Sequence, residues 1–172
     1  MIVRVSRSGV NPTDVKIRAP GSRIEGPGGN GLRWPFQIPH QGGAGRIVAV
    51  GPGGDAARVG QCVWIFMAAE GRPTGTAAEL ARVPGNRVST LPDTVSYEQA
   101  AGLGIAFLTA YGCLAPAADL AGRTVLVTGG AGAVGNAAIQ IASLSGAAVV
   151  ATVSSVEKDQ IARRAGVRRH VR

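Results

Sequence analysis

Cysteine, aromatic residues and lysine are all scarce in this sequence. The 172 residues include two cysteines, aromatic residues make up 4% of the chain, and only Lys16 and Lys158 among the 18 basic residues are lysines. Cys62 and Cys113 cannot form the paired CxxC sets of a structural zinc site, and their spacing suggests no catalytic dithiol. We therefore expect both to be buried packing residues.

Long apolar runs are absent as well. No stretch approaches the ~20 consecutive apolar residues of a membrane span. The N-terminal sequence MIVRVSRSG has no apolar core of the kind found in signal peptides. We expect no membrane span, and a cytoplasmic location follows by default.

Acidic residues are too few to balance the arginines. Charged residues make up 16% of the chain, and the formal net charge is +8. The arginines are scattered singly over most of the chain, with one dense run at residues 163–172. Nucleic-acid binding needs basic groups gathered on one face of the protein. We therefore expect no nucleic-acid partner, and we interpret the basic run as a solvated, frayed end.

Residues 1–95 have the pattern of a small β domain. Short β-rich segments are separated by glycine and proline; they lie at residues 2–5, 46–50 and 63–66, with a further candidate at 76–83. Residues 19–45 are rich in glycine and proline and hold little periodic pattern, which predicts an irregular loop.

Residues 96–172 alternate helices with apolar strands. Alanine-rich residues 97–114 suit one or two helices broken near Gly102 or Gly104. The segments that follow are a strand at 123–128, a helix at 134–145, a strand at 147–153 and a helix at 157–165. Strands that are apolar at every position are typical of parallel sheets buried on both faces. The expected fold class is α/β, with a β domain followed by the start of a doubly wound parallel sheet.

A glycine loop lies between the first strand and helix of this second region. It contains GxGxxG at Gly130, Gly132 and Gly135. The first glycine permits a tight turn, the second lets the backbone approach a pyrophosphate, and the third lets the helix pack close to the strand. The N-terminus of the helix then points unpaired N–H groups at the phosphates. The predicted contacts are Gly129, Gly130, Gly132, Ala133, Val134 and Gly135.

The context of the loop makes the motif specific. It follows a predicted strand, opens a helix and is succeeded by a second strand at the distance that a βαβ unit requires. The pattern therefore predicts a Rossmann dinucleotide site, and the alternative is a glycine turn used only for packing. No Lys-Ser or Lys-Thr follows the glycines, which excludes a P-loop.

The type of dinucleotide depends on the end of the second strand. An acidic residue there would bind the ribose 2′-hydroxyl of NAD, whereas this chain has Ser154, Ser155 and then Lys158. We predict that Ser154 and Lys158 contact the 2′-phosphate of NADP(H). The alternative is that one of the serines only caps the next helix, and the two roles can coexist.

Five motifs in a fixed order resemble those of one family. They lie at residues 8–14 (SGVNPTD), 43–51 (GAGRIVAVG), 59–64 (VGQCVW) and 104–111 (GIAFLTAY), and the glycine loop is the fifth. On these motifs the chain resembles the zinc-independent, ζ-crystallin-like quinone oxidoreductases of the medium-chain dehydrogenase/reductase superfamily. The resemblance covers nearly the whole chain. It implies a GroES-like β domain, a Rossmann domain and a cofactor cleft between them.

The resemblance also implies an activity and two further contacts. Hydride would pass from NADPH to a quinone or another electron-poor enone, and full-length members would form homo-oligomers. By position, Asn11 matches the residue that borders the nicotinamide and Thr109 matches one that contacts the cofactor. The catalytic proton donor cannot be named, because no side chain has a spacing that demands the role.

A catalytic zinc site is not expected. Such a site needs three protein ligands of the Cys, His or carboxylate type. Zinc-dependent relatives carry a Cys near Asn11 and a His-Glu pair near Gln41 and Gly42, and neither is present here. We interpret His40 as a loop histidine rather than a ligand.

The sequence departs from the family at several positions and in length. Lys16, Gly42 and Cys62 replace a usual aromatic, acidic and arginine residue, and family members run to well over three hundred residues. We therefore expect a truncated protein in which about half of the nucleotide domain is missing. The arginine-rich residues 165–172 suggest a frameshift or a fragmentary gene product. The alternative to an enzyme is a catalytically inactive remnant or a non-enzymatic binding module.

Overall fold

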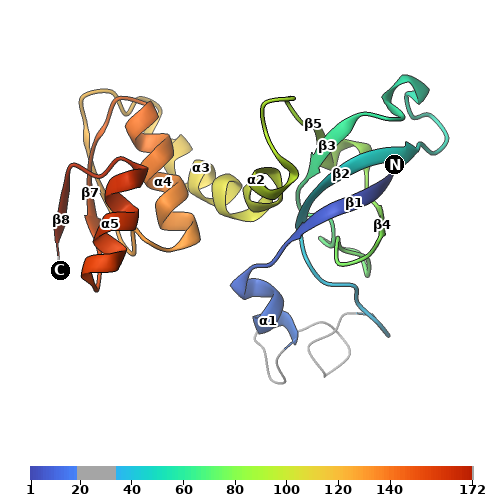
Figure 1. Cartoon of the computed structure of the whole chain (residues 1–172), viewed down its shortest axis with the longest axis horizontal. Helices are drawn as coiled ribbons and strands as arrows, with labels where there is room; N and C mark the ends of the chain where they lie inside the picture. The colour runs from blue at the N-terminus through green and yellow to red at the C-terminus, as the bar shows by residue number, and fades with distance from the viewer. Residues whose placement is uncertain (19–33, 172) are drawn as a thin grey trace. The chain divides into compact units, whose positions relative to one another are not determined.

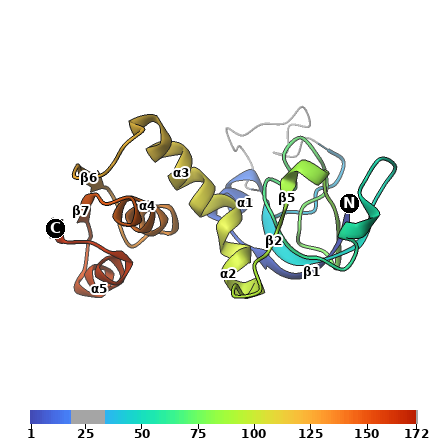
Figure 2. The same cartoon turned by 90° about the horizontal axis from the view of Figure 1, so that it is seen from above.

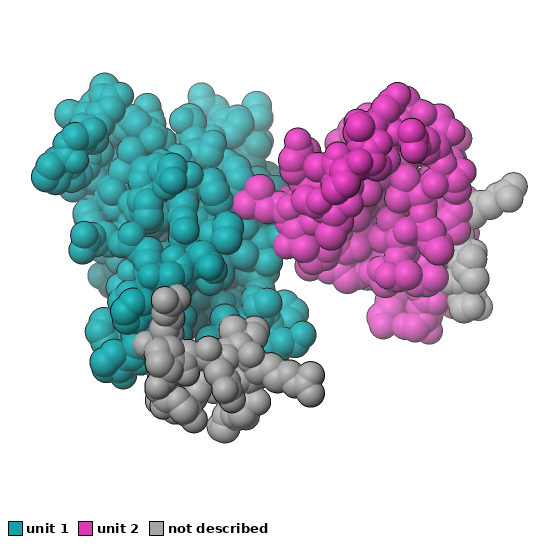
Figure 3. Space-filling view, turned by 180° about the vertical axis from the view of Figure 1, so that it is seen from behind, with its two compact units in different colours: residues 1–105 teal, residues 106–172 magenta. Residues whose placement is uncertain are grey.

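The computed structural model describes residues 1–18 and 34–171. The chain forms two compact units, Met1–Ile105 and Ala106–Arg172, which are coloured separately in Figure 3. The division into domains at residues 1–95 and 96–172 stays a prediction. The two units, called the first and second unit below, are described in turn.

An antiparallel sheet forms the body of the first unit (Figure 1). Its strand order is β4-β1-β2-β3-β5, and all four pairings are antiparallel. The strands are β1 (Ile2–Gly9), β2 (Gly42–Ala49), β3 (Cys62–Ile65), β4 (Leu80–Arg82) and β5 (Val88–Thr90). Alternate residues of these strands point into one apolar core; its buried members are Val3, Ile47, Val63, Ile65, Ala68, Ala81, Val83 and Val88.

Strand β2 begins inside a segment predicted to be loop. Residues 42–45 were expected to be irregular, yet Gly42 pairs with Gly9 and Gly45 pairs with Val5. A Cβ at Gly45 would overlap the carbonyl oxygen of Arg4. Glycine is therefore needed at position 45, because the β1 backbone passes very close to it. The prediction of a loop was wrong for residues 42–45.

Short helices complete the first unit. Helix α1 spans Pro12–Arg18, and single 3₁₀ turns lie at Ala56–Arg58 and Gly85–Arg87. Helix α2 (Tyr97–Gly102) begins with a capping box, in which the Ser96 hydroxyl accepts from the backbone N–H of Gln99 and the Gln99 side chain accepts from that of Ser96. It contacts β1, β2 and β3, so it packs on the sheet.

Helix α2 continues into a π-helical turn at Leu103–Phe107 and then into α3 (Leu108–Leu114) and a 3₁₀ turn (Ala115–Ala117). The break predicted near Gly102 or Gly104 thus takes the form of a π-helical turn. Cys113 is exposed on α3 and Cys62 is half-buried, and both are free. The expectation that both are buried was therefore wrong for Cys113.

By length and hydropathy alone, one helical run among the described residues could cross a membrane. It spans Tyr97–Ala117 and has a mean hydropathy of 1.5 in its most apolar window. No such stretch was expected from the sequence, because glycine and polar residues interrupt the apolar residues of this run. Core helices of soluble proteins pass the same test, and Ala100 and Ala110 of this run are fully buried in the fold. The run is therefore weak evidence for a span.

The second unit is a βαβαβ arrangement with a parallel sheet. Its elements are β6 (Thr124–Val127), α4 (Ala133–Leu144), β7 (Ala148–Thr152), α5 (Val156–Ala165) and β8 (Arg169–Val171), and the strand order is β6-β7-β8. Figure 2 shows α4 and α5 side by side next to the strands, and α4 contacts β6, β7 and α5. The buried core is Val127, Ile139, Ala142, Ala147, Val149, Ala151, Val153, Ala162 and Val167. The α/β fold class is confirmed.

Two expectations about this sheet were wrong. Residues 169–171 were expected to belong to a frayed end, yet their backbone forms β8 and pairs in parallel with Val150–Thr152. Strand β6 was expected to be buried on both faces, yet Leu126 is 63% exposed while Val127 is 8% exposed. The reason is that β6 is the edge strand of the described sheet, and α4 covers only one of its faces.

Candidate functional site

The predicted glycine loop connects β6 to α4. Gly129 adopts φ +66°, a left-handed conformation that favours glycine. A Cβ at Gly130 would lie 2.8 Å from the Cβ of Ala151, and one at Gly135 would overlap the carbonyl oxygen of Gly129. The loop therefore needs glycine at Gly129 for its turn and at Gly130 and Gly135 for packing.

The loop is held to the sheet by its own backbone. The N–H of Gly129 donates to Oγ1 of Thr152 (2.9 Å) and that of Gly130 donates to the Thr152 carbonyl (3.0 Å). Thr152 ends β7, and the sequence analysis missed its role. Its place at the carboxyl end of the neighbouring strand is the signal that could have found it.

The first turn of α4 has backbone N–H groups that form no hydrogen bond within the helix. Gly132 is the N-cap and has no side chain to accept from the turn, so the N–H groups of Ala133, Val134 and Gly135 have no acceptor within the helix. These donors and the positive end of the helix dipole make this terminus suited to an anion.

A cavity of about 520 Å³ lies beside this helix terminus. It is lined by Gly129, Ala131, Gly132, Thr152, Val153, Ser154, Lys158 and Ile161. The loop, the end of β7 and the start of α5 thus meet at one space. No aspartate or glutamate is among these lining residues.

The hydroxyl groups of Ser154 and Ser155 form different hydrogen bonds. Ser155 is the N-cap of α5, and its hydroxyl accepts from the backbone N–H of Lys158 (3.3 Å). The ammonium of Lys158 donates instead to Oγ of Ser154 (2.8 Å) at the cavity. The alternative of helix capping therefore applies to Ser155, and Ser154 and Lys158 are brought together at the cavity as a hydroxyl and a cation.

A family model matches the first unit. Residues 1–93 match the alcohol dehydrogenase GroES-like domain, which is more than half of the chain. The chain belongs to this family. The first unit is therefore called the GroES-like unit below.

Curated relatives extend the match beyond this unit. The quinone oxidoreductase of Rattus norvegicus is 35% identical over 161 residues, which cover 91% of this chain and 45% of the rat protein. Polyketide synthase GfsB of Streptomyces halstedii is 42% identical over 120 residues, 69% of this chain and 2% of that protein. This chain spans about half the length of the quinone oxidoreductases that it matches.

Solved structures match both units. The Escherichia coli quinone oxidoreductase complexed with NADPH has a TM-score of 0.81 and 27% identity, and the match covers 99% of this chain and 49% of that one. The Coxiella burnetii quinone oxidoreductase has a TM-score of 0.86 at 25% identity. The resemblance to quinone oxidoreductases of the medium-chain superfamily is confirmed.

Asn11 and Thr109 lie outside the lining of the glycine-loop cavity. Asn11 precedes α1 in the GroES-like unit, where its backbone N–H donates to Oδ2 of Asp14 (2.7 Å). Thr109 is exposed on α3 in the second unit. Of the predicted phosphate-side residues, those that line this cavity are Gly129, Gly132, Ser154 and Lys158.

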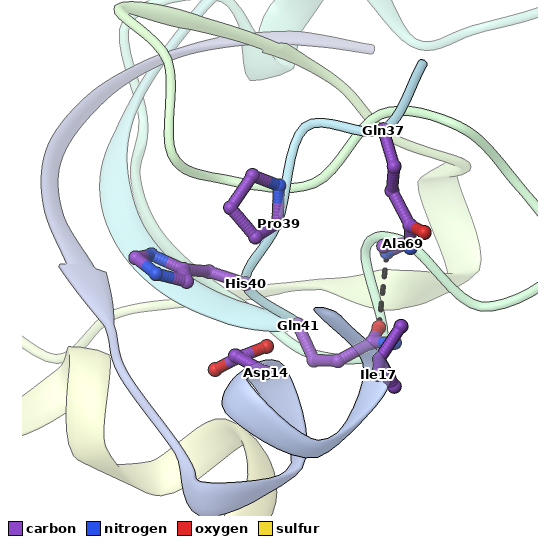
Figure 4. Close-up of a pocket in the computed structure, with 7 residues that line it drawn as sticks. All are labelled: Asp14, Ile17, Gln37, Pro39, His40, Gln41 and Ala69. Carbon is purple, nitrogen blue, oxygen red and sulfur yellow. Dashed lines mark hydrogen bonds between the residues drawn. The ribbon is translucent and has the colours of Figure 1, made fainter. Parts of the chain in front are cut away.

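A second cavity, of about 300 Å³, lies in the GroES-like unit (Figure 4). It is lined by Asp14, Ile17, Gln37, Pro39, His40, Gln41 and Ala69. The described residues contain no group of three His, Cys, Asp or Glu side chains that could hold a metal ion. The sequence analysis did not predict that His40 lines a cavity.

Proposed function

We propose that this chain binds NADPH and takes part in hydride transfer to a quinone or another electron-poor enone. One observation carries the proposal: the glycine loop that leads into α4 and the Ser154–Lys158 pair line one cavity. The solved E. coli and mycobacterial relatives, whose structures contain NADPH, support it.

The residues present fit this dinucleotide. The N–H groups of the first α4 turn suit the pyrophosphate, and the absence of a Cβ at Gly132 lets it approach the backbone. Lys158 and Ser154 supply a cation and a hydroxyl for a 2′-phosphate, and the lining holds no carboxylate that would repel it. The proposed contacts are Asn11, Thr109, Gly129, Gly130, Gly132, Ala133, Val134, Gly135, Ser154 and Lys158. When bound, the nicotinamide supplies the hydride.

The acceptor belongs to the same proposal. Hydride transfer to an alcohol or ketone is helped by a Lewis acid on the oxygen, whereas a quinone or enone is already electron-poor and needs less help. We propose the GroES-like unit, within residues 1–95, as the side that meets a small-molecule acceptor, and residues 96–172 as the nucleotide side. The names of the quinone oxidoreductase relatives support a quinone.

The test is a titration of the full chain with NADPH, read by nicotinamide fluorescence, with NADH in parallel. We expect saturable binding that prefers NADPH. The Lys158→Ala variant should lose about 10- to 100-fold in affinity for NADPH and little for NADH, because a hydrogen bond to a charged group contributes about 1.5–3 kcal/mol. Arg164→Ala is the matched control, since it removes an exposed positive charge from the same helix outside the cavity lining.

Two results would count against the proposal. Equal losses in the two variants would mean that only general electrostatics is at work, and no binding by folded protein would contradict NADPH binding itself. Saturable binding without quinone reduction would favour the inactive remnant.

A further inference from the structure

We infer that His40 is the acid–base residue of the smaller cavity, and that its Nε2 atom exchanges a proton with the oxygen of a bound quinone or hydroquinone. This inference rests on the proposed function, because it supplies the proton donor that the reaction requires. All of the residues that make up this cavity belong to the GroES-like unit.

The cavity has the make-up of a site for a small oxygen-bearing ring. Its volume of about 300 Å³ is at the lower end of the range for small-molecule pockets. Apolar surface comes from Ile17, Pro39 and Ala69, and polar groups come from Asp14, His40, Gln37 and Gln41. Figure 4 shows His40 and Asp14 on one side of this space, with Ile17 and Ala69 across it.

A chain of hydrogen bonds connects the imidazole to a backbone carbonyl. Nδ1 of His40 lies 2.8 Å from Oγ of Ser8, which lies 2.8 Å from Oγ1 of Thr76, which lies 2.6 Å from the carbonyl oxygen of Gly42. Thr76 is fully buried. A buried hydroxyl must use its hydrogen-bonding groups within the protein, so this chain is fixed in place.

The Gly42 carbonyl, at the end of this chain of hydrogen bonds, determines which group donates in each of them. The Gly42 oxygen can only accept, so Thr76 donates its single hydroxyl hydrogen to it. Thr76 must then accept from Ser8, which leaves Ser8 no hydrogen for His40. Nδ1 of His40 therefore donates to Ser8. This bond holds the neutral imidazole in the Nδ1–H tautomer and leaves Nε2 as the basic atom.

Hydrogen bonds also hold the backbone around His40 in place. His40 has φ +74°, which is unusual for a residue other than glycine, and such a conformation persists where the surroundings over-determine it. The N–H of Thr76 donates to the His40 carbonyl (3.0 Å), and that of Ala77 donates to the Pro39 carbonyl (3.2 Å). The ring is thus positioned by Ser8 at one edge and by its own backbone, and Nε2 has no partner among the described residues.

The proton balance of the reaction follows from this tautomer. The hydride adds two electrons to the quinone and leaves one oxygen as an anion. Protonated His40 gives its Nε2 proton to that oxygen, which forms the O–H bond and breaks the N–H bond. The imidazole is left in the Nδ1–H form that Ser8 favours, and solvent returns the proton.

The cavity is also close to Asn11, the residue that the resemblance places at the nicotinamide. Asp14, which lines the cavity, accepts a hydrogen bond from the backbone N–H of Asn11.

The first test is the tautomer of His40, measured without cofactor. The chain has two histidines, so long-range ¹H–¹⁵N spectra of histidine-labelled protein, with His170→Gln for assignment, show His40 alone. At alkaline pH we expect the Nδ1–H pattern. Ser8→Ala should return His40 to the Nε2–H form usual for free imidazole. Ser6→Ala is the matched control, because Ser6 is exposed on the same strand and should leave the tautomer unchanged.

The second test is binding of 4-methoxyphenol, a hydroquinone analogue that does not exchange electrons with the protein. We expect saturable shifts of the His40 ring signals. The His40→Asn variant keeps a donor in the place of Nδ1 and loses Nε2, so it should bind the phenol about 2- to 10-fold more weakly, as expected for one neutral hydrogen bond.

An Nε2–H tautomer in the unmodified chain, or unchanged phenol affinity in His40→Asn, would overturn the inference. Neither arm contains NADPH. A failed NADPH titration with both arms as expected would therefore refute the proposed function alone.

Discussion

The inner strands of the antiparallel sheet and the edge strand β6 of the parallel sheet differ in the exposure of their apolar residues. In the antiparallel sheet of the GroES-like unit, Val3, Ile47, Val63 and Ile65 are at most 1% exposed. In the parallel sheet of the second unit, Leu126 of β6 is 63% exposed although the strand is apolar. An antiparallel sheet can leave one face to water, whereas parallel sheets are normally covered on both faces. The second unit therefore depends more on the packing of its single layer of helices.

The units also use glycine differently. Gly45 lets two strands of the GroES-like unit approach each other, while Gly135 lets a helix approach a loop that is proposed to bind phosphate. A substitution at Gly135 should thus affect stability and binding together.

The largest effect is expected from Gly135→Ala. The new Cβ overlaps the carbonyl oxygen of Gly129, which belongs to the backbone and has little freedom to move. Overpacking of this kind costs about 1–3 kcal/mol, and displacement of the loop should abolish NADPH binding. Chemical denaturation and the nicotinamide titration measure the two effects.

Gly112→Ala is the control for this prediction. Gly112 is exposed on α3 of the same unit, and a Cβ there meets nothing within 4 Å. The gain in helix propensity should stabilise the protein by up to about 1 kcal/mol. If Gly135→Ala resembled Gly112→Ala in both measurements, close helix–loop packing would not be needed for the site.

The second unit was the easier of the two to predict from sequence. The glycine loop, its flanking strand and helix, and the place of Ser154 and Lys158 after the second strand all follow from local patterns at fixed spacing. What the pattern could not show is that Leu126 is exposed, because exposure depends on which neighbours cover a strand rather than on its own residues.

The second cavity was not predictable in the same way. Ser8, His40 and Thr76 are far apart in sequence, and none stands in a recognisable motif with the others. They meet because β1 pairs with β2 and because residues 74–77 run beside residues 38–40. The short β5 strand was missed for a similar reason, since three residues carry too little alternation to be recognised.

A smaller effect should distinguish two of the edge strands, β4 and β6. Leu80 lies on edge strand β4 and is 51% exposed, and Leu126 lies on edge strand β6. Charged Glu79 and Arg82 accompany Leu80, whereas apolar Val125 and Val127 flank Leu126, so β6 is the less protected edge. We expect Leu126→Thr to reduce self-association in sedimentation velocity at high concentration. Leu80→Thr should change it less, and an equal reduction would mean that general surface hydrophobicity decides.

The smallest effect is expected in the carboxyl pKa values of two glutamates that occupy equivalent positions at the starts of helices. Glu98 of α2 and Glu157 of α5 each lie two residues after a serine N-cap and are exposed. The pKa of Glu98 is lowered by its own backbone N–H, by the Ser96 hydroxyl and by the charge of Arg7, which forms a 2.8 Å ion pair with it. The pKa of Glu157 is lowered by the Ser155 hydroxyl and its own backbone N–H, without a basic partner.

Both carboxylates should therefore stabilise their helices at neutral pH. A lowered pKa in the folded state means that this stabilisation is complete above the ordinary glutamate pKa and is lost as the pH falls through the folded value. Salt screens an exposed ion pair but not a local hydrogen bond, so high salt should raise the pKa of Glu98 more than that of Glu157. Carboxyl NMR titrations measure this difference, and Arg7→Ala should remove it. An equal response to salt in the unmodified chain would show that the ion pair contributes nothing and that the two helix starts are electrostatically alike.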